Sequence, residues 1–449
     1  MTNTHLRRLA YHVLWLFLVW VMVACGTSSP SSTQTPAPVP STSTLVTTTV
    51  TPVATKIAMV QTPTLAPFSA IQREKMFDEL WNTVNDHYVY RDFRGVDWVA
   101  IHTKYRERVL NAPDTAHFYA ILKEAIDLLN DDHSRFDDPQ DASLNDALYS
   151  GEAGYAGIGI MIRELDTGLL ITRVAHNGPA EHAGLRTYDV ITAIGSTLVT
   201  TTYALGEDGY SNLLRGEIGS NVSLTIRRGN DAPYQRTITR NAIAGDAFPE
   251  AVASMLTDGT VLLTIDSFDR DGLAEIVKHA LREAYTQTQP TGLIIDIRKN
   301  GGGSIEAMLD VLGLFHDGGT IGEQVDHNNT YPLLVPKNKC LPPFDHLPIA
   351  VLTSHDTASA AEMFTAGLRH LRAITVVGET TAGNSENLYP YDFDDGSVLW
   401  LAELLYRQPN GAYIDNIGVI PDIRITDAWD DLNPANDMFI ITAQRALDK

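Results

Sequence analysis

Residues 351–381 read VLTSHDTASAAEMFTAGLRHLRAITVVGETT, and this stretch predicts a strand, a sharp turn, a helix and a second strand. The apolar run at 349–352 is typical of a buried strand, and the small polar residues after it favour a turn. Apolar side chains recur at helical spacing through 358–371, and a second apolar run at 374–377 ends at Gly378. A strand–helix–strand unit of this length predicts parallel strands joined by a right-handed crossover. We therefore expect an α/β domain built around this unit.

Ser359 is the candidate nucleophile of this unit, because it falls at the first turn of the expected helix. Unpaired backbone N–H groups and the helix dipole favour developing negative charge at such a position. A nucleophilic serine needs an exposed oxygen with amides beside it for the oxyanion. The alternative is that Ser359 is a small residue that caps the helix.

The length and the charge of the chain limit its function class. A chain of 449 residues, of which 44% are hydrophobic, has room for two or three domains with ordinary cores. The formal net charge is −22, and no basic cluster is present to meet phosphates. This acidity argues against nucleic acid as a partner. The preferred explanation of the negative charge is that it keeps the protein soluble.

The N-terminus has the features of a secretory signal. Two arginines precede an apolar run that ends in MVAC at residues 22–25, which resembles a bacterial lipobox. We expect a signal peptide at 1–24, acylation of Cys25, and a Ser/Thr/Pro-rich disordered linker over 25–67. A one-pass anchor is the alternative, but the run of 16 residues is short for a membrane span. With Cys25 acylated, Cys340 would have no disulfide partner.

Residues 68–149 are expected to form a helical domain. Apolar residues at helical spacing produce three faces, the first of which begins at Ile71. The third helix leads into the segment NDDHSRF, where Asn and Asp indicate a turn. His133 therefore falls in a loop directly after a helix, a position where a histidine is usually only solvated.

Residues 150–242 change to short strands and glycine-rich turns, and they resemble a PDZ domain over nearly the whole segment. GYAGIGI stands where PDZ domains have their carboxylate-binding loop, and GPAEHAGLRTYDVITAIG matches the signature that follows. The resemblance implies that a peptide adds to the sheet as an extra strand, with its terminal carboxylate on loop amides. The peptide-binding positions are then Gly157, Ile158, Gly159 and Ile160. A PDZ fold kept as a spacer or lid is the alternative.

Residues 243–449 are expected to form the α/β core, with strands at VLLTIDSF and GLIIDIR before the central unit. Three glycines at 301–303 stand between a strand and a helix, where their amides can form an anion-binding nest. A tight turn without binding function is the alternative. Val398 to Tyr406 is expected to be a strand, and a terminal helix is expected from about Asn436 to Leu447.

The order of these motifs is similar to that of the C-terminal processing peptidases and the tricorn-like peptidases. The resemblance rests on DDHSRF, the PDZ segment, DIRKNGGG, TASAAE, VVGETTAG and IGVIPDI, and it covers roughly residues 70–445. It implies a multidomain α/β protein with a helical domain, a PDZ-like β domain and a core of the ClpP/crotonase-like type. It also implies that Ser359 is the nucleophile, with Glu362 as the acid of the serine motif.

One branch of this family uses a lysine base, and Asn384 occupies the lysine position here. The tricorn-like branch uses Ser–His with an acid, which implies His133 as base and Asp415 as its partner. Two positions depart from that branch, since Asp415 replaces the usual Glu and Asp132 replaces an assisting serine. His355 and Lys299 remain rival bases.

The resemblance and the serine chemistry together imply that the oxyanion binds backbone amides of Ala360 and one glycine, with Gly302 favoured and Gly303 next to it.

The expected function is a secreted, lipid-anchored serine peptidase of the bacterial cell envelope that cleaves proteins or peptides and recognises C-termini through the PDZ domain. No metal or organic cofactor is implied, and the sequence does not indicate an oligomeric state. The alternative is a catalytically silent peptide- or ligand-binding protein on the same fold. An esterase of the Ser–His–Asp class is disfavoured because the chain lacks the G-x-S-x-G elbow.

Overall fold

The structure is a computed structural model that describes residues 68–448, except 132, 150–154, 200–208, 245–246, 287, 427–428, 430–431 and 434–435. The predicted signal peptide at 1–24, the lipidation site Cys25 and the linker at 25–67 lie outside the described residues. Within this described part, none of the helices combines the length and the apolar character needed to cross a bilayer.

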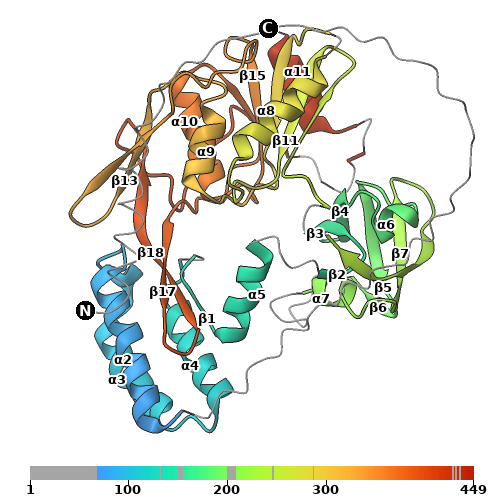
Figure 1. Ribbon diagram of the computed structural model, residues 1–449. Coiled ribbons are helices and arrows are strands. Elements are labelled where there is room, and N and C mark those ends of the chain that lie inside the picture. Colours follow the sequence, from blue (N-terminus) through green and yellow to red (C-terminus); the bar gives the residue numbers. More distant parts are fainter. Residues whose placement is uncertain are drawn as a thin grey trace, which may run out of the picture. The chain divides into compact units, whose positions relative to one another are not determined.

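The core is built on a six-stranded sheet that contains the predicted strand–helix–strand unit (Figure 1). Its strand order is β10 (Ala251–Met255), β11 (Thr260–Ile265), β12 (Gly292–Asp296), β15 (Ile349–Thr353), β16 (Thr375–Gly378) and β19 (Ile423–Arg424). The pairs from β11 to β19 are parallel, and β10 is antiparallel at one edge. The parallel pairing of β15 with β16 agrees with the predicted crossover.

Both faces of this sheet are covered, as the unbroken apolar strands require. Alternate residues such as Leu293 and Val351 pack in one core with helices α8 (Leu273–Ala284), α9 (Ile305–Leu312) and α10 (Ala360–Leu371). Their neighbours, including Ile294 and Leu352, face a second core with the terminal helix α11 (Met438–Leu447). The period-two alternation of side chains along a strand explains why adjacent residues enter different cores.

The N-terminal part is helical, as predicted, with α2 (Ala70–His87), α3 (Trp98–Leu110) and α4 (Thr115–Asp127), and a 3-10 turn η1 at Phe93–Gly95. Each long helix begins at a side-chain cap, formed by Ser69, Asp97 and Asp114. The expectation for Ile71 is wrong, since this side chain is 79% exposed and the apolar face starts at Met76. Helix α5 (Pro139–Tyr149) follows in a segment where no separate helix was predicted.

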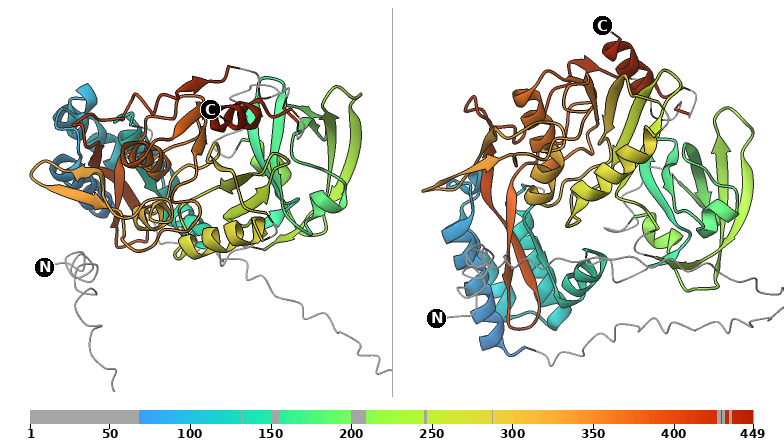
Figure 2. Two further views of the ribbon diagram at one scale, coloured as in Figure 1. Left: turned by 90° about the horizontal axis from the view of Figure 1, so that it is seen from above. Right: turned by 45° about the horizontal axis from the view of Figure 1, so that its top comes forward.

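A second sheet joins the helical part to the core, and it was not predicted. Its order is β1 (Arg135–Asp137), β18 (Val398–Arg407), β13 (Thr320–Val325) and β14 (Thr330–Leu334), and β17 (Asn387–Asp392) also pairs with β18. Phe136 of β1 and Leu399 of β18 lie in one apolar cluster with α2, α3 and α4. Figure 1 and Figure 2 show the β17–β18 hairpin alongside these helices. The helical part therefore shares its apolar cluster with the β17–β18 hairpin, which comes from the C-terminal part of the chain.

The PDZ-like part contains a sheet in the order β3 (Ile160–Leu165), β4 (Gly168–Val174), β5 (Asp189–Ile194), β7 (Asn221–Arg228) and β8 (Tyr234–Thr239), with β6 (Thr197–Leu198) paired to β5. Strands β2 (Tyr155–Gly157) and β9 (Asn241–Ile243) pair where the chain enters and leaves. Short helices α6 (Pro179–His182) and α7 (Ser211–Leu214) complete this part. Strand β3 lies at the edge of its sheet, and no other strand of the described residues covers one side of its backbone.

Candidate active site

Ser359 lies at the junction between the turn that follows β15 and helix α10. The turn after β15 is fixed to the end of β12 by Thr357, whose Oγ1 donates to the Ile297 carbonyl at 2.9 Å. Ser359 is the N-cap residue of α10 and has φ 54° and ψ −125°. This positive φ is unfavourable for a residue with a Cβ and costs on the order of 1–3 kcal/mol. Such strain is typical of functional positions and supports Ser359 as the reactive serine.

The glycine turn at 301–303 lies directly against Ser359. A Cβ added to Gly302 would come within 2.6 Å of the Ser359 Cβ and 3.1 Å of the Ala360 nitrogen. Gly302 and Gly303 also have positive φ values of 111° and 125°. Only glycine allows this backbone to approach the serine so closely.

One of the three expected oxyanion-hole residues already has a hydrogen-bond acceptor for its amide. The Gly302 N–H donates to Asn300 Oδ1 at 2.9 Å, so this favoured amide already has a partner. In the described part of the chain, neither the Ala360 N–H nor the Gly303 N–H has a hydrogen-bond acceptor. The Ala360 and Gly303 amides are therefore without an internal acceptor, and Gly302 provides the close approach of the turn to Ser359.

The fully buried Glu362 connects Ser359 to the next loop. Its Oε1 accepts from Thr381 Oγ1 and from the Gly383 N–H at 2.8 Å. Its Oε2 accepts from the Asn384 N–H at 2.8 Å and from the Ser359 N–H at 3.2 Å. Burial raises the pKa of Glu362, and the four hydrogen bonds oppose that rise. Its role here is therefore to fix the backbone of the site.

His133 is placed by a compact turn between α4 and β1. The Asp131 carboxylate accepts from the His133 N–H at 3.0 Å and from the Ser134 N–H and hydroxyl, both at 2.6 Å. Ser134 Oγ in turn accepts from the Ala402 N–H of β18 at 3.1 Å. His133 also lines a hollow at the end of α4, so its side chain is accessible from solvent.

The carboxylate beside the His133 imidazole is that of Glu386, which the sequence did not indicate. His133 Nδ1 lies 3.3 Å from Glu386 Oε2, and the Glu386 side chain is 2% exposed. Glu386 Oε1 accepts from the Tyr90 hydroxyl at 2.6 Å. Burial and the Glu386 carboxylate raise the pKa of Tyr90, which keeps this hydroxyl as a donor. The available signal was the position of Glu386, two residues after Asn384 in a loop already expected at the site.

Asp415, the predicted partner of His133, bonds to a different residue. Its Oδ1 accepts from the Ser385 hydroxyl at 2.7 Å and from the Ser385 N–H at 3.2 Å. Among the described residues, no hydrogen bond or ion pair joins Asp415 to His133. Burial, together with the charge of Glu386, raises the pKa of Asp415 to about 6. Asp is one methylene shorter than the expected Glu, and here its carboxylate ends at Ser385.

The loop at 381–386 connects the serine to the histidine. The Ser359 N–H donates to the Asn384 carbonyl at 2.8 Å, and Glu386, two residues later, lies beside His133. No hydrogen bond joins Ser359 Oγ to His133 in the part of the chain that is described. Hydrogen bonds between a catalytic serine and its base are often long without substrate, so this arrangement is compatible with catalysis.

The rival bases have other environments. His355 is exposed, and its backbone N–H donates to Glu379. The Lys299 ammonium lies 2.8 Å from Asp356, and burial lowers its pKa to about 8. The backbone of Asn384 bonds to Ser359 and Glu362, so this loop still supports the serine although the lysine is absent.

Two hydrogen bonds hold the backbone of the predicted peptide-binding loop. The Gly159 carbonyl accepts from the Ala175 N–H, the Ile158 carbonyl accepts from the Ala180 N–H, and both bonds are 2.9 Å long. Gly159 has φ 76°, and an added Cβ would lie 3.0 Å from the Ala175 Cβ. Gly157 ends β2, and Ile160 begins the edge strand β3. This loop therefore presents backbone groups at the open edge of the sheet.

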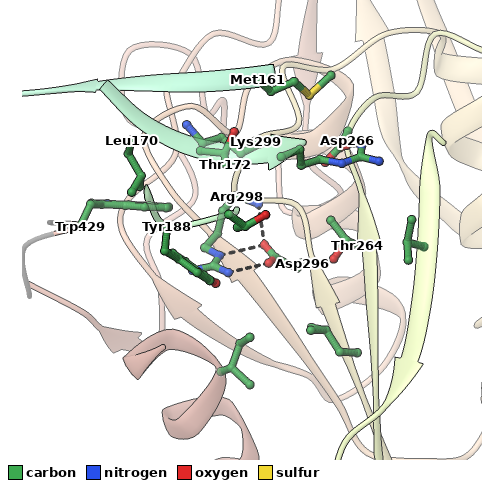
Figure 3. Close-up of a pocket in the computed structure, with 15 residues that line it drawn as sticks. Met161, Leu170, Thr172, Tyr188, Thr264, Asp266, Asp296, Arg298, Lys299 and Trp429 are labelled. Atoms are coloured by element: carbon green, nitrogen blue, oxygen red, sulfur yellow. Dashed lines mark hydrogen bonds and ion pairs between the residues drawn. The ribbon is translucent and has the colours of Figure 1, made fainter. Parts of the chain in front are cut away.

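A separate cavity of about 270 Å³ is lined by residues of the PDZ-like part and of the core (Figure 3). An ion pair of 2.6 Å between Arg298 and Asp296 forms part of its wall, and Arg298 also pairs with Asp437 at 2.9 Å. These charges satisfy one another, as the dashed lines of Figure 3 indicate for Arg298 and Asp296. Ser359, His133 and Asp415 are not among its lining residues, so this cavity is distinct from the serine site.

Three family models match successive parts of the chain. They are the Tricorn protease C1 domain over residues 70–127, the PDZ domain over 156–234 and Peptidase family S41 over 259–425. Their order agrees with the helical part, the PDZ part and the core of the structure.

Curated relatives and solved structures match most of the chain. The carboxyl-terminal-processing protease of Synechocystis sp. is 27% identical over 373 residues, which cover 82% of this chain and 83% of the relative. A chloroplastic C-terminal processing peptidase of Tetradesmus obliquus is 27% identical, with 80% and 79% covered. The solved photosystem II D1 C-terminal processing protease has a TM-score of 0.57 at 24% identity, with 82% of this chain and 96% of that chain covered. The last comparison supports the fold.

The raised pKa of Asp415 predicts a specific pH dependence of stability. The native state binds the Asp415 proton more tightly than the unfolded chain, so this group's contribution to stability falls as pH rises from about 4 to about 6. Asp415→Asn removes this contribution. The free energy of unfolding of the variant, minus that of the wild type, should increase by up to about 3 kcal/mol between pH 4 and pH 7.

Urea unfolding at a series of pH values measures this difference. Asp271→Asn, at an exposed position, is the control and should run parallel to the wild type. A parallel curve for Asp415→Asn would contradict the raised pKa.

Proposed function

We propose that this chain, a serine peptidase with a PDZ domain that is similar to the C-terminal processing peptidases, cleaves protein or peptide substrates with Ser359 as nucleophile and His133 as base. The observation that carries this proposal is the strained N-cap conformation of Ser359, with the glycine turn against it. The proposal of a histidine base rests on the position of His133 Nδ1 beside the Glu386 carboxylate and on the presence of Asn384 at the lysine position.

The reaction follows from this geometry. Neutral His133 takes the proton of Ser359 Oγ as the oxygen attacks the scissile carbonyl. The tetrahedral oxyanion then receives hydrogen bonds from the Ala360 and Gly303 amides, each worth on the order of 3 kcal/mol. His133 returns the proton to the leaving amine. Water, deprotonated by the same imidazole, hydrolyses the acyl-enzyme and restores the Ser359 hydroxyl.

We infer that the PDZ part binds the C-terminal segment of a substrate. Strand β3 is at the sheet edge, where a peptide can add as a further strand. The loop at 157–160 stands at the beginning of this strand and is the place for the terminal carboxylate.

We also propose that the protein is secreted and anchored in the bacterial cell envelope through acylated Cys25. This proposal rests on the sequence MVAC after an apolar run and on the Ser/Thr/Pro-rich segment that follows.

Catalysis by Ser359 and His133 is tested with single and double variants of the full chain. Ser359→Ala and His133→Ala should each lower the turnover of a peptide substrate by several orders of magnitude, and the double variant should lose little more, because the two groups act as a unit. Asn384→Ala should have a milder effect, since its side chain cannot accept the proton.

Labelling of Ser359 by a fluorophosphonate separates catalysis from mere binding. If the fluorophosphonate never labels the protein, and if Ser359→Ala and His133→Ala have the same turnover as the wild type, the chain is the catalytically silent binding protein. Full activity of His133→Ala together with loss of activity in His355→Ala or Lys299→Ala would assign a different base.

The PDZ proposal is tested with peptides that differ only at the C-terminus. On the full-length Ser359→Ala variant, a free-acid peptide should bind at least tenfold more tightly than its amidated form, because the loop amides bind the carboxylate. Calorimetric titration measures both affinities. Equal affinities would remove carboxylate recognition from the function.

The anchoring proposal is tested by Cys25→Ser in a lipoprotein-processing bacterium. The wild type should appear in the membrane fraction, with a mature N-terminus at acylated Cys25 by mass spectrometry, and Cys25→Ser should leave that fraction. A mature protein that retains residues 1–24, or one with an unmodified Cys25 thiol, would exclude the anchor.

A further inference from the structure

Two buried atoms without a hydrogen-bond partner face each other behind the site. His133 Nδ1 and Glu386 Oε2 lie 3.3 Å apart, and in the described part of the chain neither has a hydrogen bond to any group. A buried polar atom without a partner is destabilising, so a small rotation that brings His133 Nδ1 and Glu386 Oε2 together is favourable. We propose that Glu386 is the residue that orients the His133 imidazole, in place of Asp415.

Glu386 is well suited to this role because its second oxygen is fixed. Tyr90, which follows α2, donates its hydroxyl to Glu386 Oε1 at 2.6 Å. Glu386 itself is 3% exposed, so water does not compete for the carboxylate. The remaining oxygen, Oε2, is the one that lies beside His133. The Tyr90 contact therefore sets which carboxylate oxygen faces the imidazole.

Asp415 is less suited to orient His133. Its Oδ1 accepts two hydrogen bonds from Ser385, which direct the carboxylate to the backbone of the 381–386 loop. No hydrogen bond or ion pair between Asp415 and His133 is present among the described residues. Asp415 instead supports the residue that precedes Glu386, and so fixes the loop that presents Glu386.

The proposed contact defines the tautomer of the base. With Nδ1–H donated to Glu386, Nε2 has no proton and is free to accept one from a serine hydroxyl. The carboxylate also stabilises the imidazolium that forms in the transition state. Glu386 would touch neither substrate nor the reacting atoms, so it is a positioning residue. The loop in which Asn384 replaces a lysine thus supplies a carboxylate two residues later.

This inference rests on the proposed function, so the test includes the two catalytic positions. Glu386→Gln, Glu386→Asp, Tyr90→Phe and Asp415→Asn are compared in the full chain with Ser359→Ala and His133→Ala. Glu275→Gln, on the surface of α8 with its side chain 73% exposed, is the matched control for the loss of a glutamate charge. The measurements are kcat and KM on one peptide substrate, the rate of fluorophosphonate labelling and the thermal unfolding midpoint by circular dichroism.

A positioning role predicts a defined order of effects. Glu386→Gln can present an N–H to Nδ1 and select the wrong tautomer, so kcat and labelling should fall by roughly 10²- to 10⁴-fold while KM changes less than threefold. Glu386→Asp keeps the carboxylate, so its kcat and labelling rate should be at least tenfold higher than those of Glu386→Gln. Tyr90→Phe should lower kcat by about tenfold with unchanged KM, because the hydroxyl's hold on Oε1 is lost. Glu275→Gln should equal the wild type.

The outcomes separate this inference from the proposed function. Inactive Ser359→Ala and His133→Ala with near-full activity of Glu386→Gln and a severe loss in Asp415→Asn would overturn the role of Glu386 alone. Full activity of His133→Ala would overturn the histidine base itself. If Glu386→Gln fails to fold, the unfolding midpoint shows it, and Tyr90→Phe decides. A folded Tyr90→Phe with wild-type kcat and labelling would then overturn the inference.

Discussion

The four hydrogen bonds to the buried Glu362 carboxylate are the constraint on which the rest of the site depends. They join the start of α10 to the 381–384 loop, so that Ser359 and Asn384 are fixed by one side chain. A carboxylate in the first turn of a helix also meets the positive end of the helix dipole. These hydrogen bonds offset the cost of burying the Glu362 carboxylate. They also hold Ser359 in its strained backbone conformation, which only the surrounding structure can maintain.

The second constraint is the pairing of β1 with β18. Arg135 pairs with Trp400 and Phe136 with Leu399, only two or three residues after His133. The Ser134 hydroxyl adds a hydrogen bond to the same strand. The pairing thereby fixes His133, a residue of the N-terminal part, beside strand β18. Tyr90, just after α2, reaches Glu386 in the 381–386 loop. The histidine position is therefore a product of long-range strand pairing, whereas the serine position is largely local.

This difference explains what could be predicted. The crossover unit and the three N-terminal helices follow from apolar periodicity, and the structure agrees with them. Ser359 was identified because its position depends on a local strand–turn–helix pattern. The Glu386 contact could not be predicted, since it depends on where two distant segments meet. The Gly302 N–H was expected to donate to the oxyanion, but it donates to the side-chain oxygen of Asn300 instead. A sequence does not reveal such competition between acceptors.

The shared β1–β18 pairing has a consequence for the timing of proteolysis. Residues 68–137 are synthesised long before residues 398–407, and the two strands can pair only when both have emerged and docked. With His133 as the base, a partly folded chain has a serine but no general base beside it, and is inert. Hydrolysis would begin only when the last-made half of the molecule closes on the first. Such a chain is protected from digesting itself before its folding is complete.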